Sequence, residues 1–219
     1  MSSSRSSRSS RSSRSSRSSR SSRSSSSEHE RTYHHGDLRR AILAAALDVI
    51  AANGPAALSL RDLARRAGVS HAAPAHHFKD RTGLLTAVAA EGYALFADAL
   101  AGAPDLRERG VAYVRFAATH PAHFQVMFQP DLYRTDDPDV LASKARATEA
   151  LRAGVADLPP GGRGEDDRLA GVAAWSLAHG FATLLLSGNL ADATEGRDPE
   201  AVFRSLTGLI FTPENRRDG

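Results

Sequence analysis

The sequence predicts an all-α protein in which a unit of three helices near the N-terminus is followed by a longer helical domain. Ala, Leu and Arg dominate the chain, and runs of β-branched residues are absent. Apolar residues recur at the three-to-four-residue period of a helix, and Gly and Pro fall between the periodic segments. No strand is evident in this pattern, so there is none for a Gly-rich phosphate loop to follow.

The three N-terminal helices are predicted from their caps and apolar faces. Asp37 is a good N-cap for a first helix that ends where Asn, Gly and Pro follow one another at 53–55. A second helix is expected over 59–67, where Ser59 opens a start resembling a capping box, and a third over about 71–78 after a tight turn. The inward positions are Leu38, Ile42, Ala45, Ala46, Val49, Ile50, Leu60, Leu63 and Ala64.

Proline and glycine bound the remaining helices. The prolines lie at helix starts or in connections, where the missing N–H costs little. The clearest break in the second half is Pro159-Pro160-Gly161-Gly162. We expect helices at about 81–101, 105–119, 121–128, 138–158, 166–187 and 199–211.

The first 27 residues form a low-complexity tail of one Met, seven Arg and 19 Ser. The Arg-Ser-Ser repeat that makes up most of the tail has no apolar side chain to bury, so we expect residues 1–29 to be disordered. A flexible arm of charge +7 could bind nucleic-acid phosphates without reading sequence. A low-complexity extension without a role is the alternative, and both stay open.

Charge and composition exclude several classes of protein. The chain has 219 residues and a formal net charge of +3, but residues 28–92 carry only +1 and residues 93–219 carry −5. Basicity is therefore weak support for nucleic-acid binding by the body of the chain. The absence of Cys excludes disulfides, thiolate nucleophiles and Cys-ligated zinc. No run approaches about 18 consecutive apolar residues, so no membrane-spanning segment is expected.

Residues 59–78 have the form of a helix-turn-helix, with a capped helix, a turn at Gly68 and a second short helix. Such a unit places the start of its second helix in the DNA major groove. An ordinary helical hairpin has the same spacing and stays open as an alternative at this point. The wider string 33–89, with His77-Phe78-Lys79-Asp80-Arg81 near its end, resembles the DNA-binding domain of the TetR/AcrR transcriptional regulators.

This resemblance implies a DNA-binding domain over 30–80 and assigns contacts by position. The family usually has an aromatic residue where this chain has Ala75, and Pro74 replaces a more ordinary helix former; the consequence of Ala75 stays open. The implied base-reading face is His71, Ala72 and Ala73; the implied phosphate clamps are His76, His77, Lys79 and Arg81; further implied contacts are Tyr33, His34, Ser59, Arg61 and Ser70.

Two islands in the second half, 119–128 and 175–180, are similar to the TetR-type C-terminal domain named for its Trp-His-Gly motif. This similarity implies a helical domain over 81–212 that binds an unassigned small-molecule effector and dimerises, followed by a flexible 213–219. Apolar side chains with a histidine for polar contact suit such a pocket, although core packing is the alternative for each residue. The candidates are Phe116, His120, Phe124, Met127, Phe128, Trp175 and His179.

Wide apolar faces on the last two long helices also predict a homodimer. Two such helices can pair with their symmetry mates as a four-helix bundle, or they can pack inside the monomer. The faces comprise Leu169, Val172, Ala173, Leu177, Phe181, Leu184 and Leu185, and then Val202, Leu206, Leu209 and Ile210.

Together these features predict a DNA-binding transcriptional regulator, which we expect to be a ligand-responsive repressor that binds a pseudo-palindromic operator of double-stranded DNA as a homodimer. We expect no enzymatic activity, cofactor, metal or membrane partner, and a cytoplasmic, nucleoid-associated protein. Two alternatives remain: an all-helical enzyme or metal protein that uses histidines such as His120 and His123, and a non-specific nucleic-acid binder acting through the tail. The sequence identifies neither the effector nor the operator and its genes, and it does not separate repression from activation.

Overall fold

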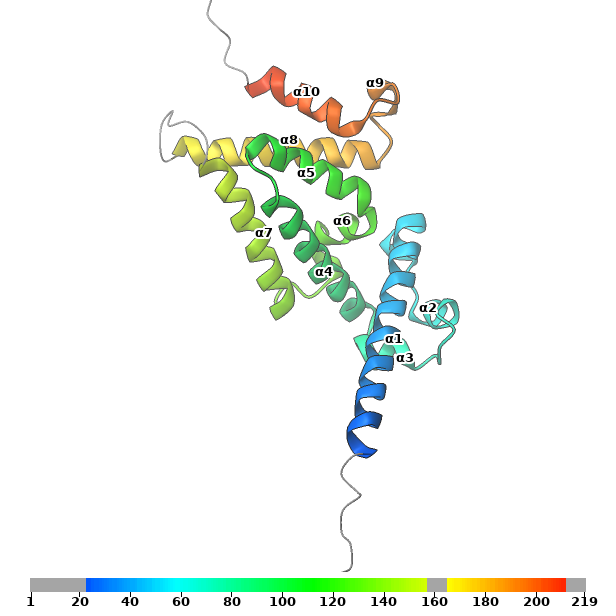
Figure 1. Cartoon of the computed structure of the whole chain (residues 1–219). Coiled ribbons are helices and arrows are strands. Elements are labelled where there is room, and N and C mark those ends of the chain that lie inside the picture. The colour runs from blue at the N-terminus through cyan, green and yellow to red at the C-terminus, as the bar shows by residue number, and fades with distance from the viewer. Residues whose placement is uncertain (1–22, 157–164, 212–219) are drawn as a thin grey trace, which may run out of the picture. The chain divides into compact units, whose positions relative to one another are not determined.

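The computed structural model describes residues 23–156 and 165–211, and every regular element within these ranges is a helix (Figure 1). The predicted all-α fold is confirmed. The elements are α1 Arg23–Asn53, η1 Pro55–Ala57, α2 Leu60–Arg66, α3 Ala73–Phe78, α4 Arg81–Ala101, α5 Leu106–Thr119, α6 Pro121–Met127, η2 Pro130–Leu132, α7 Pro138–Ala156, α8 Glu165–Leu186, α9 Ala191–Thr194 and α10 Pro199–Phe211.

The predicted start of the first helix was wrong. Helix α1 begins at Arg23, so Asp37 lies inside the helix and is not its N-cap, and residues 23–29 are helical where disorder was expected. No proline interrupts this stretch, and a single Gly36 costs a helix only about 1 kcal/mol relative to Ala. The rest of the predicted tail, residues 1–22, and the predicted flexible end, 213–219, lie outside the described residues.

Helices α2 and α3 follow the predicted pattern with one change of boundary. The hydroxyl of Ser59 accepts a hydrogen bond from the backbone N–H of Asp62 at 3.4 Å, as the capping-box start predicts. Helix α3 begins at Ala73 and not at 71, because the residues before it form a turn that ends in an N-cap at Ala72. The buried side chains of this unit are Ile42, Leu43, Ala46, Val49, Ile50, Leu58, Leu63, Ala64 and Phe78.

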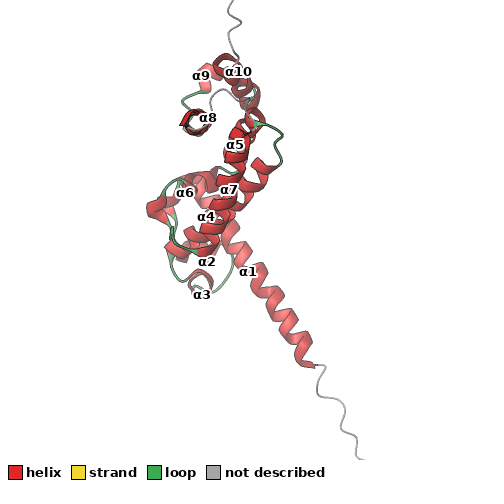
Figure 2. Ribbon diagram, turned by 90° about the vertical axis from the view of Figure 1, so that its left-hand side faces the viewer, coloured by secondary structure: helices red, strands yellow, loops and turns green. Residues whose placement is uncertain are grey.

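Helix α4 is the central helix of the second half. It packs against α5, α6 and α7, and α5 in turn packs against α8 and α10. Figure 2 shows α5 between α4 on one side and α8 with α10 on the other. The predicted bounds of α4 and α10 are confirmed at both ends, and Asp105 caps α5 by accepting from the N–H of Glu108 at 2.8 Å. The short elements η1, η2 and α9 were not predicted.

Among the residues that the structure describes, two helices, α4 and α8, are long and apolar enough to cross a membrane by length and composition, although no long apolar run was visible in the sequence. They differ in burial, since 56% of the apolar stretch of α4 is buried inside the protein but only 17% of that of α8. Helix α4 therefore serves as a core helix, whereas α8 keeps an uncovered apolar face.

Candidate nucleic-acid interface and apolar cavity

The α2–turn–α3 segment presents most of its predicted DNA contacts to solvent. The side chains of Arg61, Ser70, His71, Ala72, His76 and Lys79 are exposed, and those of Ser59, Ala73, His77 and Arg81 are half-buried. Ala75, where the resembling family usually has an aromatic residue, is also exposed. Tyr33 and His34 lie in α1, and their side chains are outside the described part of the chain.

Arg81 already has a partner inside the protein. Its guanidinium group donates to the carbonyl oxygen of Pro55 at 2.7 Å and so ties the turn after α1 to the start of α4. A phosphate contact by Arg81 stays a prediction, and it would have to share or replace this bond.

The junction between α3 and α4 is a tight backbone turn at Lys79. Lys79 has a φ of 67° and a ψ of −61°, and the N–H of Asp80 donates across it to the carbonyl of Phe78 at 2.8 Å. This is a γ-turn with positive φ, a rare and strained conformation for a residue with a side chain. The turn places the exposed side chain of Lys79 just after α3, the predicted recognition helix, where a phosphate contact is expected.

Asp80 connects this junction to a distant part of the chain. Its carboxylate caps α4 by accepting from the N–H of Gly83 at 2.7 Å, and it also accepts from the guanidinium of Arg134 at 2.7 Å. The Gly83 N–H first, and then Arg134, hold the pKa of the Asp80 carboxyl below its usual range. The backbone N–H of Arg134 donates to the hydroxyl of Thr86 at 3.0 Å, so the segment at 134 is bonded twice to the first turns of α4.

The neighbouring Tyr133 extends this connection toward the middle of α4. The hydroxyls of Tyr93 and Tyr133 both donate to the carbonyl of Met127, at 2.9 and 3.0 Å. Burial raises the pKa of Tyr93, which keeps its hydroxyl protonated. Residues 133–134 therefore link the N-terminus of α4 to a side chain that lines a large cavity.

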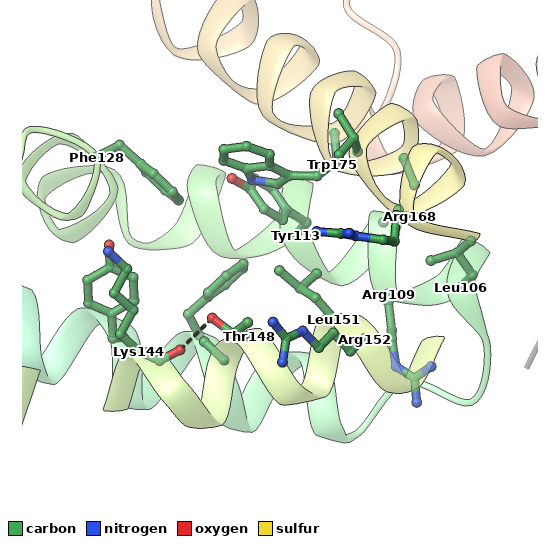
Figure 3. Close-up of a pocket in the computed structure, with 18 residues that line it drawn as sticks. Leu106, Arg109, Tyr113, Phe128, Lys144, Thr148, Leu151, Arg152, Arg168 and Trp175 are labelled. Carbon is green, nitrogen blue, oxygen red and sulfur yellow. Dashed lines mark hydrogen bonds between the residues drawn. The ribbon is translucent and has the colours of Figure 1, made fainter. Parts of the chain in front are cut away.

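This cavity has a volume of about 690 Å³ and lies among α4, α5, α7 and α8 (Figure 3). Its walls are mainly apolar and aromatic, with basic side chains from three of the helices. The lining residues are Tyr93, Phe96, Leu106, Arg109, Gly110, Tyr113, Phe128, Lys144, Ala147, Thr148, Leu151, Arg152, Arg168, Gly171, Val172, Ala174, Trp175 and Ala178.

Two of the seven predicted pocket residues, Phe128 and Trp175, line the cavity. Phe116, Phe124 and Met127 are buried core side chains, which is the alternative that the sequence left open. The other two, His120 and His179, lie outside the lining, and burial lowers the pKa of both.

Each of these two histidines contacts an aromatic side chain of α5. The ring of His120 stacks on Phe116 at a centroid distance of 5.0 Å and bonds to the Thr119 hydroxyl. His179 lies behind the cavity wall, with its Nδ1 2.8 Å from the hydroxyl of Tyr113. It therefore positions a lining residue.

The lining residues that were not predicted come from all four helices, with α7 and α8 contributing the most. Lys144, Thr148 and Leu151 follow the i, i+4, i+7 spacing of one helical face. That spacing was available in the sequence, but nothing local indicated that this face borders a cavity.

The alternative of a metal site at His120 and His123 is not supported, although one carboxylate does lie close to His123. The Nε2 of His123 is 3.1 Å from a carboxylate oxygen of Glu91, a neighbour that the sequence pattern had not indicated. Among the residues that the structure describes, no group of three or more His, Cys, Asp or Glu side chains could hold a metal ion.

Two family models match the chain on either side of the α4–α5 connection. Residues 42–88 match the model for bacterial regulatory proteins of the tetR family, and residues 106–209 match the tetracyclin repressor-like C-terminal domain. This chain belongs to the tetR family. The helix-turn-helix of this TetR-family protein is thus a DNA-binding unit, and the protein is a DNA-binding transcriptional regulator. The Trp-His-Gly subtype stays a prediction.

Solved structures similar to this TetR-family protein agree with the assignment. A protein of unknown function from Rhodococcus sp. RHA1 is 33% identical, with a TM-score of 0.64, over 81% of this chain and 95% of that one. The TetR-family regulator PfmR of Thermus thermophilus is 26% identical, with a TM-score of 0.54, over 77% and 96% of the two chains. A tetR-family regulatory protein from Rhodococcus RHA1 shares the fold at 23% identity and a TM-score of 0.59, over 78% and 94%. No curated protein sequence matches the chain.

Proposed function

We propose that this TetR-family protein is a ligand-responsive repressor that binds a pseudo-palindromic operator as a homodimer and releases it when an effector occupies the cavity. The observation that carries the proposal is the connection between cavity and DNA-binding unit. Tyr93 lines the cavity, and residues 133–134 link it to Asp80, the N-cap of α4. The proposal includes the predicted domains 30–80 and 81–212, a cytoplasmic location on the nucleoid, and the absence of enzymatic activity.

The coupling works through the N-terminus of α4. An effector that displaces Tyr93 or α7 shifts the bonds that Arg134 makes with Asp80 and Thr86. Helix α4 begins three residues after α3 ends, so a shift of the first turn of α4 also moves α3, the predicted recognition helix. The effector then favours a conformation whose two recognition helices no longer match the half-sites, which is a population shift between two states.

The uncovered face of α8 supports a homodimer. Leu169 and Leu184 are exposed on this helix, Leu169 to 61%, and Leu209 on α10 is exposed to 83%. The predicted alternative, packing inside the monomer, holds for Phe181, which is buried against Phe203. Large exposed apolar faces mark interaction sites, and a two-fold partner presenting the same α8 and α10 faces would cover them.

A substitution at Gly180 can test the proposed dimer interface. A Cβ added at Gly180 would meet no atom within 4 Å, so monomer packing does not require a glycine there. The small residues Ala173, Ser176, Gly180 and Thr183 recur along the same helix at spacings of three and four, which lets two helices approach closely.

We expect Gly180→Arg to convert a dimer into a monomer at low micromolar concentration, measured by light scattering, because a long charged side chain would be forced into the helix contact. Ala142→Arg, at an exposed position of α7, is the matched control and should leave the mass unchanged. A monomeric wild-type protein, or a dimeric Gly180→Arg variant, would contradict the proposed interface. Partition of the wild-type protein into lipid vesicles would instead assign the face of α8 to a membrane.

The division between base-reading and phosphate-clamping residues can be tested separately. An operator is first identified by selecting the genomic DNA fragments that the protein binds. His71→Ala should reduce the preference for operator over random DNA. Lys79→Gly should weaken binding to both DNAs alike and reduce the slope of log K against log salt by about one, because it removes one phosphate contact. Gly accepts the positive φ of this turn, so the second variant removes the charge without adding strain. Equal losses on both DNAs for both variants would refute the division of roles.

A further inference from the structure

The interior of the cavity suits a hydrocarbon. Its volume of about 690 Å³ is within the usual range for small-molecule sites, which is about 300–1,000 Å³. Aromatic side chains from α4, α5 and α8 form much of the wall, among them Phe96, Tyr113 and Trp175. At about 30 Å³ for a group the size of a water molecule, this volume holds roughly twenty such groups.

The charged side chains that the described residues contribute to the cavity all have the same sign. Arg109, Lys144, Arg152 and Arg168 contribute to its lining, and no carboxylate among the described residues does. Figure 3 shows Arg168 reaching from α8 toward Tyr113, with Arg152 beside Leu151 and Lys144 on the side of Phe128. The side chains of Lys144, Arg152 and Arg168 are exposed, which places their charges at the mouth of an apolar space.

Arg152 and Arg168 differ from other arginines of the same domain. Arg115, Arg146 and Arg204 each form an ion pair with a carboxylate. Arg152 and Arg168 form none with any carboxylate that the structure describes. Like charges that share one mouth repel each other, and an anion bound between them would relieve that repulsion.

We propose that the effector is an amphipathic organic anion, with an extended hydrocarbon body in the cavity and a carboxylate or phosphate head at Arg152 and Arg168. This inference rests on the proposed function, because it names the ligand class of the same effector site. The aromatic wall removes the hydrocarbon from water, and the two guanidinium groups bind the head through charge-assisted hydrogen bonds.

The chain contains its own reporter for this site. Trp175 is the single tryptophan of the sequence and it lines the cavity, so intrinsic fluorescence reports occupancy directly. The probes are decanoate, dodecanoate, decyl phosphate, decan-1-ol and decyltrimethylammonium, titrated below their micelle concentrations. Decanoate and decyl phosphate share the anionic chemistry, and their relative affinities distinguish a carboxylate from a phosphate head.

We expect saturable binding of both decyl anions and none of decyltrimethylammonium. Dodecanoate should bind about 15-fold more tightly than decanoate, at about fourfold per added methylene. Arg152→Gln with Arg168→Gln should weaken decanoate at least tenfold and leave decan-1-ol unchanged. Arg146→Gln is the matched control on α7, because Arg146 pairs with Asp98 and does not line the cavity.

The outcomes separate this inference from the proposed function. The proposed ligand class is refuted if decan-1-ol and decyltrimethylammonium bind as tightly as decanoate. It is also refuted if no anion binds to a protein that still binds its operator. In both cases the DNA-binding role stands. If decanoate binds but leaves operator affinity unchanged, the class of ligand holds and the proposed coupling fails. If the variant with both Arg152→Gln and Arg168→Gln folds like the wild type and binds decanoate with unchanged affinity, the head group does not bind at these two arginines.

Discussion

Replacing Gly83 by Ala is expected to disrupt the α3–α4 junction and abolish specific DNA binding. A Cβ at this position would overlap the carbonyl oxygen of Phe78 and would lie 2.9 Å from the Arg134 guanidinium. The carbonyl has little freedom to move, because it accepts the hydrogen bond that closes the turn at Lys79, and the Phe78 side chain is buried. We expect a loss of about 3 kcal/mol or more in the free energy of unfolding.

Gly102→Ala is the matched control for this substitution. Gly102 follows the other end of α4 with a φ of −75°, and a Cβ there would meet nothing closer than 3.8 Å. Ala should therefore be tolerated within about 1 kcal/mol. Thermal unfolding and operator binding are measured for both variants. Wild-type stability and operator affinity in Gly83→Ala would show that the junction can relax, and would remove the rigid link on which the proposed coupling depends.

Phe203→Ala is expected to release α10 from α5 and thereby destabilise both the monomer and the dimer. Phe203 is 1% exposed and its ring lies directly over Gly110, where an added Cβ would approach the ring to 2.8 Å. Truncation of a buried Phe to Ala costs about 3–5 kcal/mol, which corresponds to a fall of about 10 °C in Tm for a domain of this size. Because α10 carries the exposed Leu209, the variant should also dimerise less well.

The ion pairs beside Phe203 do not replace it. Arg204 and Arg115 reach Glu108 and Glu200 across the same helix pair, but these are partly exposed groups, and such pairs stabilise a protein by about 1 kcal/mol or less each. Leu141→Ala, at a 53% exposed position of α7, is the control and should leave Tm within about 1 °C. A Phe203→Ala protein that melts with the wild type would contradict the role given to this side chain.

The DNA-binding side of the molecule was predictable because its signals are local. Ser59 as a cap, Gly68 in a turn with a φ of 67°, and the run 77–81 all lie within a few residues of the predicted DNA contacts. The start of α1 was predicted wrongly because Asp37 has the side chain of a good N-cap although it lies inside the helix. No helix-breaking residue marks the actual start at Arg23. The γ-turn at Lys79 had no signal, since a positive φ at lysine follows from the packing of its neighbours.

The helical fold, the helix-turn-helix, the family resemblance and the division of charge between a basic tail and an acidic second half could all be recognised from the amino-acid sequence. Helical period and caps act over three to five residues, so they can be read along the chain. The packing of the helices was needed to show which aromatic side chains are core and which line the cavity, and to show that Arg134 bonds to Asp80, 54 residues away. A cavity forms where four helices fail to fill the space between them. That depends on side-chain volumes summed over distant segments, which no local pattern records.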